Sequence, residues 1–211
     1  MTYKYIDMNS YERKDHFEYF RSLQYPYVGV TVDVDVTDIV EYCKKNDYSF
    51  FLMFMHAVAL AADEVKQLRQ RIRQGKIVEY DECPTSHTEL LDNGTYCYCT
   101  VHHHMDDKEY YKQALEARQS CKENGISEDD EVESMYFITS LPWINYTSLI
   151  QPVAAGDESN PRISWGKYIK DETGKYHMPV SILVHHGLVD GMHIGQFYEN
   201  LDKHIKTFAL Y

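Results

Sequence analysis

The chain has 211 residues, of which 44% are hydrophobic, 26% charged and 14% aromatic, and its formal net charge is −12. No run approaches the ~18 consecutive apolar residues of a membrane span, and the first residues lack the apolar core of a signal peptide, so we expect no membrane partner. An acidic surface repels phosphodiester backbones, so nucleic acid is not an expected partner either. The five cysteines have no repeating spacing, which favours reduced thiols in a cytoplasmic protein.

In the first third of the chain, hydrophobic periodicity predicts helices over residues 10–23, 37–45 and 49–73 and a strand over residues 28–36. The serine and the threonine that begin the first two helices are expected to cap them. In the strand, valine occupies every second position, which indicates one buried face. The long helix is apolar on all sides at first and then amphipathic and basic, so we expect it to enter the core and leave into solvent.

Strands and helices alternate along the rest of the chain. The turn signals are Asn93-Gly94, Thr173-Gly174 and, at the end of a helix, Asn124-Gly125. This order predicts an α+β fold, a two-layer sandwich in which helices cover a mainly antiparallel mixed sheet. No linker or repeat interrupts the pattern, so we expect residues 1–211 to form a single domain. Strands are predicted over residues 76–80, 85–91, 95–101, 135–140, 161–168 and 176–186, and helices over 106–124 and 191–208.

Two adjacent histidines, His185 and His186, follow the last predicted strand and precede a tight turn that contains Asp190. A strand that ends at a turn can fix an imidazole beside a ligand, which suits a general base. Successive strand residues face opposite sides, however, so one of the two could be a hydrogen-bonded core histidine. Asp190 could hold the turn by accepting hydrogen bonds or by binding an arginine.

Four motifs lie in the same order along the chain as in a known enzyme family. The string His186-Gly-Leu-Val-Asp190-Gly191 matches the signature HxxxDG, and residues 138–143, Ile-Thr-Ser-Leu-Pro-Trp, are similar to a segment ISALPW. Residues 13–21 resemble the family's N-terminal helix, and Lys167-Tyr168 stands before the last strand, where the family has a Lys-Tyr pair. Together these motifs resemble the chloramphenicol acetyltransferase family of CoA-dependent acyltransferases.

The resemblance implies an acetyl-CoA-dependent O-acetyltransferase, with chloramphenicol as the leading hydroxyl acceptor and antibiotic resistance as the associated role. It implies that His186 is the general base, that Thr139 stands in for a serine that donates to the oxyanion, and that Asp190 pairs with Arg13 to orient the turn. It also implies a homotrimer with active sites between subunits, in which one subunit supplies His186 and the other most of the acceptor pocket. No metal is expected. The implied CoA-binding residues are Trp143, Ser164, Lys167 and Tyr168, and the implied acceptor-binding residues are Tyr19, Phe20, Gln24, Pro26, Val28, Tyr96 and Tyr98.

The acceptor side departs from the family pattern, because Tyr96-Cys97-Tyr98 places a bulky tyrosine where a small alanine is usual. Ser49 stands where the family has a basic residue that helps to hold CoA. The alternatives that stay open are an acyltransferase for another hydroxyl acceptor, a catalytically silent binding relative, and the core of a dihydrolipoamide acyltransferase. The last typically has Asp-His-Arg where this chain has His185-His186-Gly187.

A zinc site is a further alternative. Cys97 and Cys99 share one face of a predicted strand and precede His102-His103-His104, and both residue types are zinc ligands. Their spacing matches no established zinc pattern, so this reading ranks below the enzymatic one.

Overall fold

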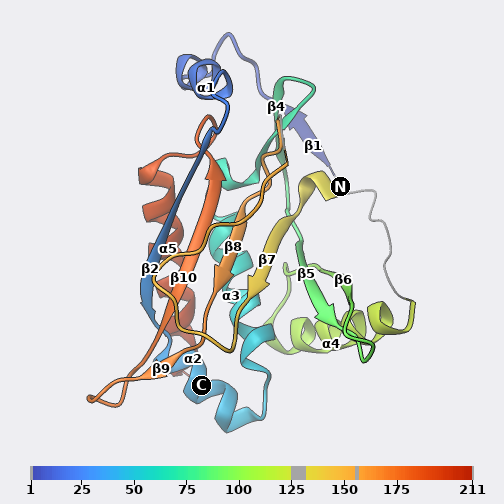
Figure 1. Cartoon of the computed structure of the whole chain (residues 1–211), viewed down its shortest axis with the longest axis vertical. Helices are drawn as coiled ribbons and strands as arrows, with labels where there is room; N and C mark the ends of the chain where they lie inside the picture. The colour runs from blue at the N-terminus through green and yellow to red at the C-terminus, as the bar shows by residue number, and fades with distance from the viewer. Residues whose placement is uncertain (1, 125–131, 155–156, 211) are drawn as a thin grey trace.

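The computed structural model describes residues 2–124, 132–154 and 157–210. In these ranges, the strands form two sheets, and the larger one carries the strands that surround the histidine pair (Figure 1). The smaller sheet has the order β1 (Tyr3–Tyr5), β4 (Lys76–Tyr80), β3 (Gln70–Arg73). The larger has the order β2 (Tyr27–Asp35), β10 (Tyr176–His185), β8 (Arg162–Trp165), β7 (Tyr136–Ser140), β5 (Thr85–Leu90), β6 (Tyr96–Val101), and β9 (Ile169–Lys170) pairs with β10.

The larger sheet is mixed. β10 pairs antiparallel with β2, β8 and β9, and β5 pairs antiparallel with β6, whereas β7 runs parallel to both β8 and β5. Most of the paired positions are therefore antiparallel, as the element order predicts.

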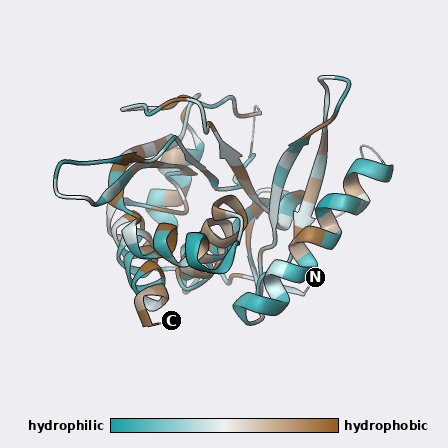
Figure 2. Cartoon of the chain, turned by 90° about the horizontal axis from the view of Figure 1, so that it is seen from below, coloured by the Kyte–Doolittle hydropathy of each residue, from teal (hydrophilic) through white to brown (hydrophobic). Residues whose placement is uncertain are grey.

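Helices cover one face of this sheet. α3 (Phe50–Asp63) packs against α5 (Gly191–Thr207), α2 (Thr37–Asn46) and α4 (Asp107–Asn124), and α4 also packs against β5 and β6 (Figure 1). Figure 2 shows hydrophilic and hydrophobic stretches along the same helices, which is typical of helices that bury only one side. Among the described residues there are also three short 3₁₀ helices: η1 (Lys66–Arg69), η2 (Val132–Ser134) and η3 (Phe208–Leu210). The expected fold class is confirmed. In the described ranges, no helix combines the length and apolar composition that a membrane crossing needs.

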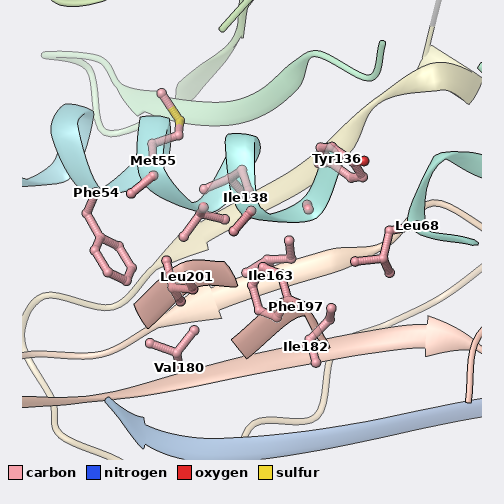
Figure 3. Packing of buried hydrophobic residues seen from close by; sticks show 14 of the residues in the cluster. Phe54, Met55, Leu68, Tyr136, Ile138, Ile163, Val180, Ile182, Phe197 and Leu201 are labelled. Carbon is pink, nitrogen blue, oxygen red and sulfur yellow. The ribbon is translucent and has the colours of Figure 1, made fainter. Parts of the chain in front are cut away.

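The hydrophobic core lies between the helices and the sheet. In Figure 3, Phe54 of α3 points toward the sheet, and Phe197 and Leu201 of α5 lie beside Ile163 of β8 and Ile182 of β10. All five side chains are at most 1% exposed. This layer fixes the sheet whose strand ends carry the candidate site.

The prediction of one helix over residues 49–73 is wrong in its second half. α3 ends at Asp63, η1 follows, and residues 70–73 form β3, which turns into β4 through Gln74 and Gly75 at positive φ. Arg71 is fully buried rather than solvated, and its five N–H donors reach backbone carbonyls. These carbonyls belong to Leu68, Gln70, Glu133, Ser134 and Met135. A sequence pattern cannot anticipate acceptors that lie more than sixty residues away.

Several element boundaries also differ from expectation. The first helix, α1 (Lys14–Arg21), begins after Arg13, so Ser10 does not cap it. At α2 the side chain of Asp35 accepts from the N–H and hydroxyl of Thr37, so Asp35 takes the capping role expected of Thr37. β2 lies at the sheet edge, where its valines are only partly covered. The strand expected over 161–168 is confined to β8, and β1 was not anticipated. Gly125, the expected helix-stop residue, lies outside the described residues.

Candidate active site

His186 lies at the turn between β10 and α5, with its backbone and one ring nitrogen both fixed. Its N–H donates to the carbonyl of Pro26 at 2.8 Å, and its Nδ1 lies 3.1 Å from the carbonyl oxygen of Val189. Because a carbonyl only accepts, Nδ1 carries the proton and Nε2 presents a lone pair. The ring of Phe20 stacks on the imidazole with centroids 3.9 Å apart and planes inclined by 13°. This tautomer and this fixed ring suit a base that takes a proton at Nε2.

His185 is the core histidine of the pair. It is 2% exposed, and its Nδ1 accepts from the N–H of Gly187 at 3.1 Å. Burial lowers the pKa of His185 to about 4, so the ring is neutral near pH 7. A Cβ on Gly187 would lie 3.0 and 3.1 Å from two atoms of this ring, so a side chain at this position would crowd the imidazole of His185.

Asp190 organises the turn that follows. It is the N-cap of α5: its Oδ1 accepts from the N–H of Met192 at 3.1 Å, and its own N–H donates to Nδ1 of His193. Its Oδ2 is paired with Nη1 of Arg13. Burial raises the pKa of Asp190, but the charges of His193 and Arg13 and the hydrogen bonds at the cap outweigh it, so the pKa is lowered. The contacts of Asp190 are with Arg13 and the helix start, whereas Nδ1 of His186 binds a backbone carbonyl.

Five of the seven predicted acceptor residues lie on the same sheet edge as His186. Tyr19 and Phe20 stand on α1 with their rings 5.1 Å apart, and Val28 lies on β2 opposite Val184 of β10. Gln24 and Pro26 line a cavity of about 790 Å³ between α1 and the start of β2. The other two, Tyr96 and Tyr98, are on β6 at the opposite edge, where both are about half exposed. Five strand steps separate the two edges, or about 24 Å at the usual interstrand spacing.

Thr139 is also distant from His186 within one chain. It is exposed on β7 and pairs with Ser164 of β8, which in turn pairs with Ser181 of β10. Ser181 precedes His186 by five residues along β10, so standard strand geometry separates the Cα atoms of Thr139 and His186 by roughly 19 Å. A hydroxyl at that distance does not reach an oxyanion that forms beside His186 of the same chain.

The predicted CoA-binding residues fall in three places. Lys167 and Tyr168 line a cavity of about 520 Å³ at the end of the sheet beside the start of α3. Ser164 instead lines a second cavity of about 380 Å³ on the other face, where its buried hydroxyl has no hydrogen-bond partner among the residues described. Trp143 is in neither cavity and is 78% exposed.

Sequence reasoning missed several residues of the 520 Å³ cavity. Arg118 of α4 reaches its wall, held by Glu89 of β5 at 3.0 Å, and Lys122 lies 3.5 Å from the same carboxylate. Phe50 and Trp165 supply apolar lining. A cavity with cationic and aromatic walls can hold an anionic ligand that has an apolar part. No sequence signal marked Arg118, because its place depends on how α4 packs against the sheet.

Comparisons with known proteins agree over nearly the full length. A family model described as chloramphenicol acetyltransferase matches residues 1–202. A chloramphenicol acetyltransferase from a Klebsiella species is 28% identical over 208 residues, which cover 96% of this chain and 93% of that protein. A solved structure of a chloramphenicol acetyltransferase has a TM-score of 0.84 at 26% identity and covers 97% of this chain and 100% of that chain. A probable dihydrolipoamide acetyltransferase from Listeria monocytogenes 4b F2365 has a TM-score of 0.70 at 15% identity, covers 98% of this chain and 95% of that chain, and therefore shares the fold alone.

Proposed function

The chain belongs to the chloramphenicol acetyltransferase family and is an acyltransferase, and we propose that it transfers an acetyl group from acetyl-CoA to a hydroxyl group of chloramphenicol. The observation that carries this proposal is the fixed tautomer of His186, whose Nδ1 is engaged by the carbonyl of Val189. Nε2 then accepts the proton of the substrate hydroxyl, and the hydroxyl oxygen attacks the thioester carbonyl. The tetrahedral intermediate collapses as its C–S bond breaks, and the CoA thiolate leaves as a thiol with the proton that Nε2 returns. No covalent acyl-enzyme is needed.

Asp190 and Arg13 act in this proposal as positioning residues. Their ion pair holds the turn from the side of α1, while the N-cap holds it from the side of α5. Both contacts limit the motion of His186 relative to its acceptor.

We propose that a second copy of the chain completes each active site, as in a homotrimer. The roughly 19 Å between Thr139 and His186 within one chain supports this division. One subunit then contributes His186 with Tyr19, Phe20, Gln24, Pro26 and Val28, and its neighbour contributes Thr139, Tyr96 and Tyr98. This division differs from the one that the resemblance implies, because most of the acceptor residues lie beside His186 of their own chain. The hydroxyl of Thr139 donates to the oxyanion, and loss of one such donor typically costs on the order of 10²–10³ in rate.

We assign acetyl-CoA to the 520 Å³ cavity. Lys167 offers its charge to the phosphates, while Arg118 at the wall is paired with Glu89, and the aromatic lining suits the apolar portions of the ligand. The CoA-binding roles of Ser164 and Trp143 are proposals that rest on the resemblance, because Ser164 lines the separate 380 Å³ cavity and Trp143 is exposed outside the 520 Å³ cavity. A cytoplasmic location, a role in antibiotic resistance and a single domain over residues 1–211 complete the proposal.

Thiol release with acetyl-CoA and a panel of hydroxyl acceptors tests the reaction. Wild type is expected to release CoA fastest with chloramphenicol, and His186→Ala to lose this activity. The exposed His16 provides a matched control, since His16→Ala should retain the wild-type rate. Equal rates for wild type and His186→Ala would refute the mechanism, and a faster rate with another acceptor would refute chloramphenicol as the substrate.

Mixing two inactive variants tests the shared site. In trimers assembled from equal amounts of His186→Ala and Thr139→Ala chains, about one quarter of the interfaces would combine an intact His186 with an intact Thr139. Activity should therefore return to about one quarter of the wild-type level, well above either variant alone. No recovery in verified mixed trimers would place the whole site within one chain.

A further inference from the structure

Three metal-ligating side chains meet at the end of α3, away from the candidate active site. Asp63 is the last residue of α3, and His103 and His104 follow β6 some forty residues later. Oδ2 of Asp63 lies 3.0 Å from Nε2 of His103 and 2.9 Å from Nε2 of His104. One ligand atom from each of the three residues lies within 4.8 Å of the other two.

We propose that Asp63, His103 and His104 bind a divalent transition-metal cation of the zinc class. Two imidazole nitrogens and one carboxylate oxygen form a ligand set that zinc accepts, with water in the fourth position. Zinc–nitrogen distances of about 2.0–2.1 Å place neighbouring ligand atoms of a tetrahedral site about 3.3 Å apart. The two contacts with Asp63 are already close to that separation. The gap between the two histidine nitrogens needs to close by at most about 1.5 Å, which rotation of the half-exposed His104 can supply.

Neighbouring residues already hold the ligands in place. The hydroxyl of Tyr136, a fully buried residue, donates to Oδ1 of Asp63 at 2.6 Å and leaves Oδ2 for the cation. His103 is fully buried, and its carbonyl accepts from Nε2 of His56 at 2.9 Å. The bond from Tyr136 orients the ligating carboxylate as outer hydrogen bonds do in metal sites, and the bond from His56 fixes the backbone that carries His103.

The open side of the cluster is acidic and wide enough for water. Asp63 and His104 line a cavity of about 430 Å³ together with Glu64, Glu79 and Asp81. Lys4 and Arg69 are its cationic lining residues, and both pair with Glu79. The remaining carboxylates give this opening a negative charge that favours entry of a cation.

This ligand set differs from the one that the sequence suggests. Cys97 and Cys99 are buried between β6 and α4, and Cys99 belongs to the hydrophobic core. Burial raises the pKa of Cys99 to about 11, which disfavours the thiolate that a metal requires. The sequence offers His103 and His104 as candidate ligands but does not identify Asp63 as their neighbour.

Metal titration of the whole purified chain tests the site. After removal of bound metal with a chelator, the chain is titrated with Zn²⁺ against a chromophoric zinc indicator, and Co²⁺ reports coordination geometry by visible absorption. His104→Gln removes one ligand at a half-exposed position, where the fold tolerates the change. His102→Gln is the matched control, because His102 is exposed beside it and faces Glu82 instead.

Wild type and His102→Gln should each bind one equivalent of Zn²⁺ and give the intense visible bands of tetrahedral Co²⁺. His104→Gln should lower the Zn²⁺ affinity at least tenfold and lose those bands. The proposal is wrong if wild type and His104→Gln bind Zn²⁺ equally, if wild type binds none, or if Co²⁺ shows a thiolate charge-transfer band from a cysteine ligand.

Discussion

Asp190 is both a helix cap and one half of an ion pair, and two substitutions separate these contributions. Asparagine caps a helix about as well as aspartate, so Asp190→Asn keeps the bond from the N–H of Met192 and removes only the charge that faces Arg13. Asp190→Ala removes both contributions.

The exposure of the two partners sets the expected size of the effect. The side chains of Arg13 and Asp190 are 18% and 30% exposed, so their pair lies between two limits. An exposed pair contributes about 0–1 kcal/mol, whereas breaking a buried one costs about 3–5 kcal/mol. We expect Asp190→Asn to lower the free energy of unfolding by about 1–2 kcal/mol, and Asp190→Ala by about 1 kcal/mol more through loss of the cap.

Urea unfolding followed by circular dichroism measures both values, and its pH dependence tests the cause. Folding lowers the pKa of Asp190 below its ordinary value of 3.8, so the ion pair stabilises the protein above that pH and the contribution is lost as the pH falls through the folded-state pKa. The gap between wild type and Asp190→Asn should therefore be full at pH 7 and shrink below pH 3.8. An Asp190→Asn variant as stable as wild type at pH 7 would refute the ion-pair argument, and equal losses in both variants would refute the cap.

Three further predictions follow from buried groups and close contacts. Arg71→Met leaves five carbonyls without their donor and should lower the free energy of unfolding in urea by about 3–5 kcal/mol. Arg73→Met, at a part-exposed position, should lower it by under about 1 kcal/mol. Similar losses in the two variants would contradict the role of the buried cation. His185 has a folded-state pKa of about 4, so between pH 4 and 6.5 it binds a proton only in the unfolded chain, which lowers the stability of wild type as the pH falls. His185→Gln should therefore lose less free energy of unfolding than wild type from pH 7 to pH 5. Parallel curves of stability against pH for the two proteins would contradict this. Gly187→Ala crowds the ring of His185 and should lower kcat at least tenfold, whereas Gly195→Ala, with open space around it, should not; an unaffected kcat in both would show that the turn tolerates a side chain.

Local signals predicted much of the fold, because they depend on residues close in sequence. Asn93-Gly94 turns β5 into β6 with Gly94 at positive φ, and the side chain of Asp106 accepts from the N–H groups that begin α4. The segment after Asp63 escaped prediction for the opposite reason. Its charged residues favour a solvated helix. In the structure, however, Arg71 is buried and donates to the carbonyls of residues 133–135, which only the tertiary fold brings near.

The candidate site divides in the same way. The pairing of Asp190 with Arg13 could be anticipated from two short motifs that the family resemblance matches, and the structure contains this ion pair. The distance of Tyr98 and Thr139 from His186 could not be predicted from the residues themselves, because it depends on the order of strands in the sheet. Spacing along the chain contains no information about which edge a strand occupies.

Arg71 of the smaller sheet is linked to the segment that precedes β7. The guanidinium makes this link only through hydrogen bonds to backbone carbonyls. Carbonyl groups do not titrate, and dipoles buried at a fully covered site are shielded from dissolved ions. This junction is therefore expected to hold in acid and in concentrated salt, where ion pairs such as Arg13–Asp190 weaken. The five carbonyls also require a planar group with five donors. Lysine has only three, so a lysine at this position would leave some of the carbonyls without a hydrogen bond.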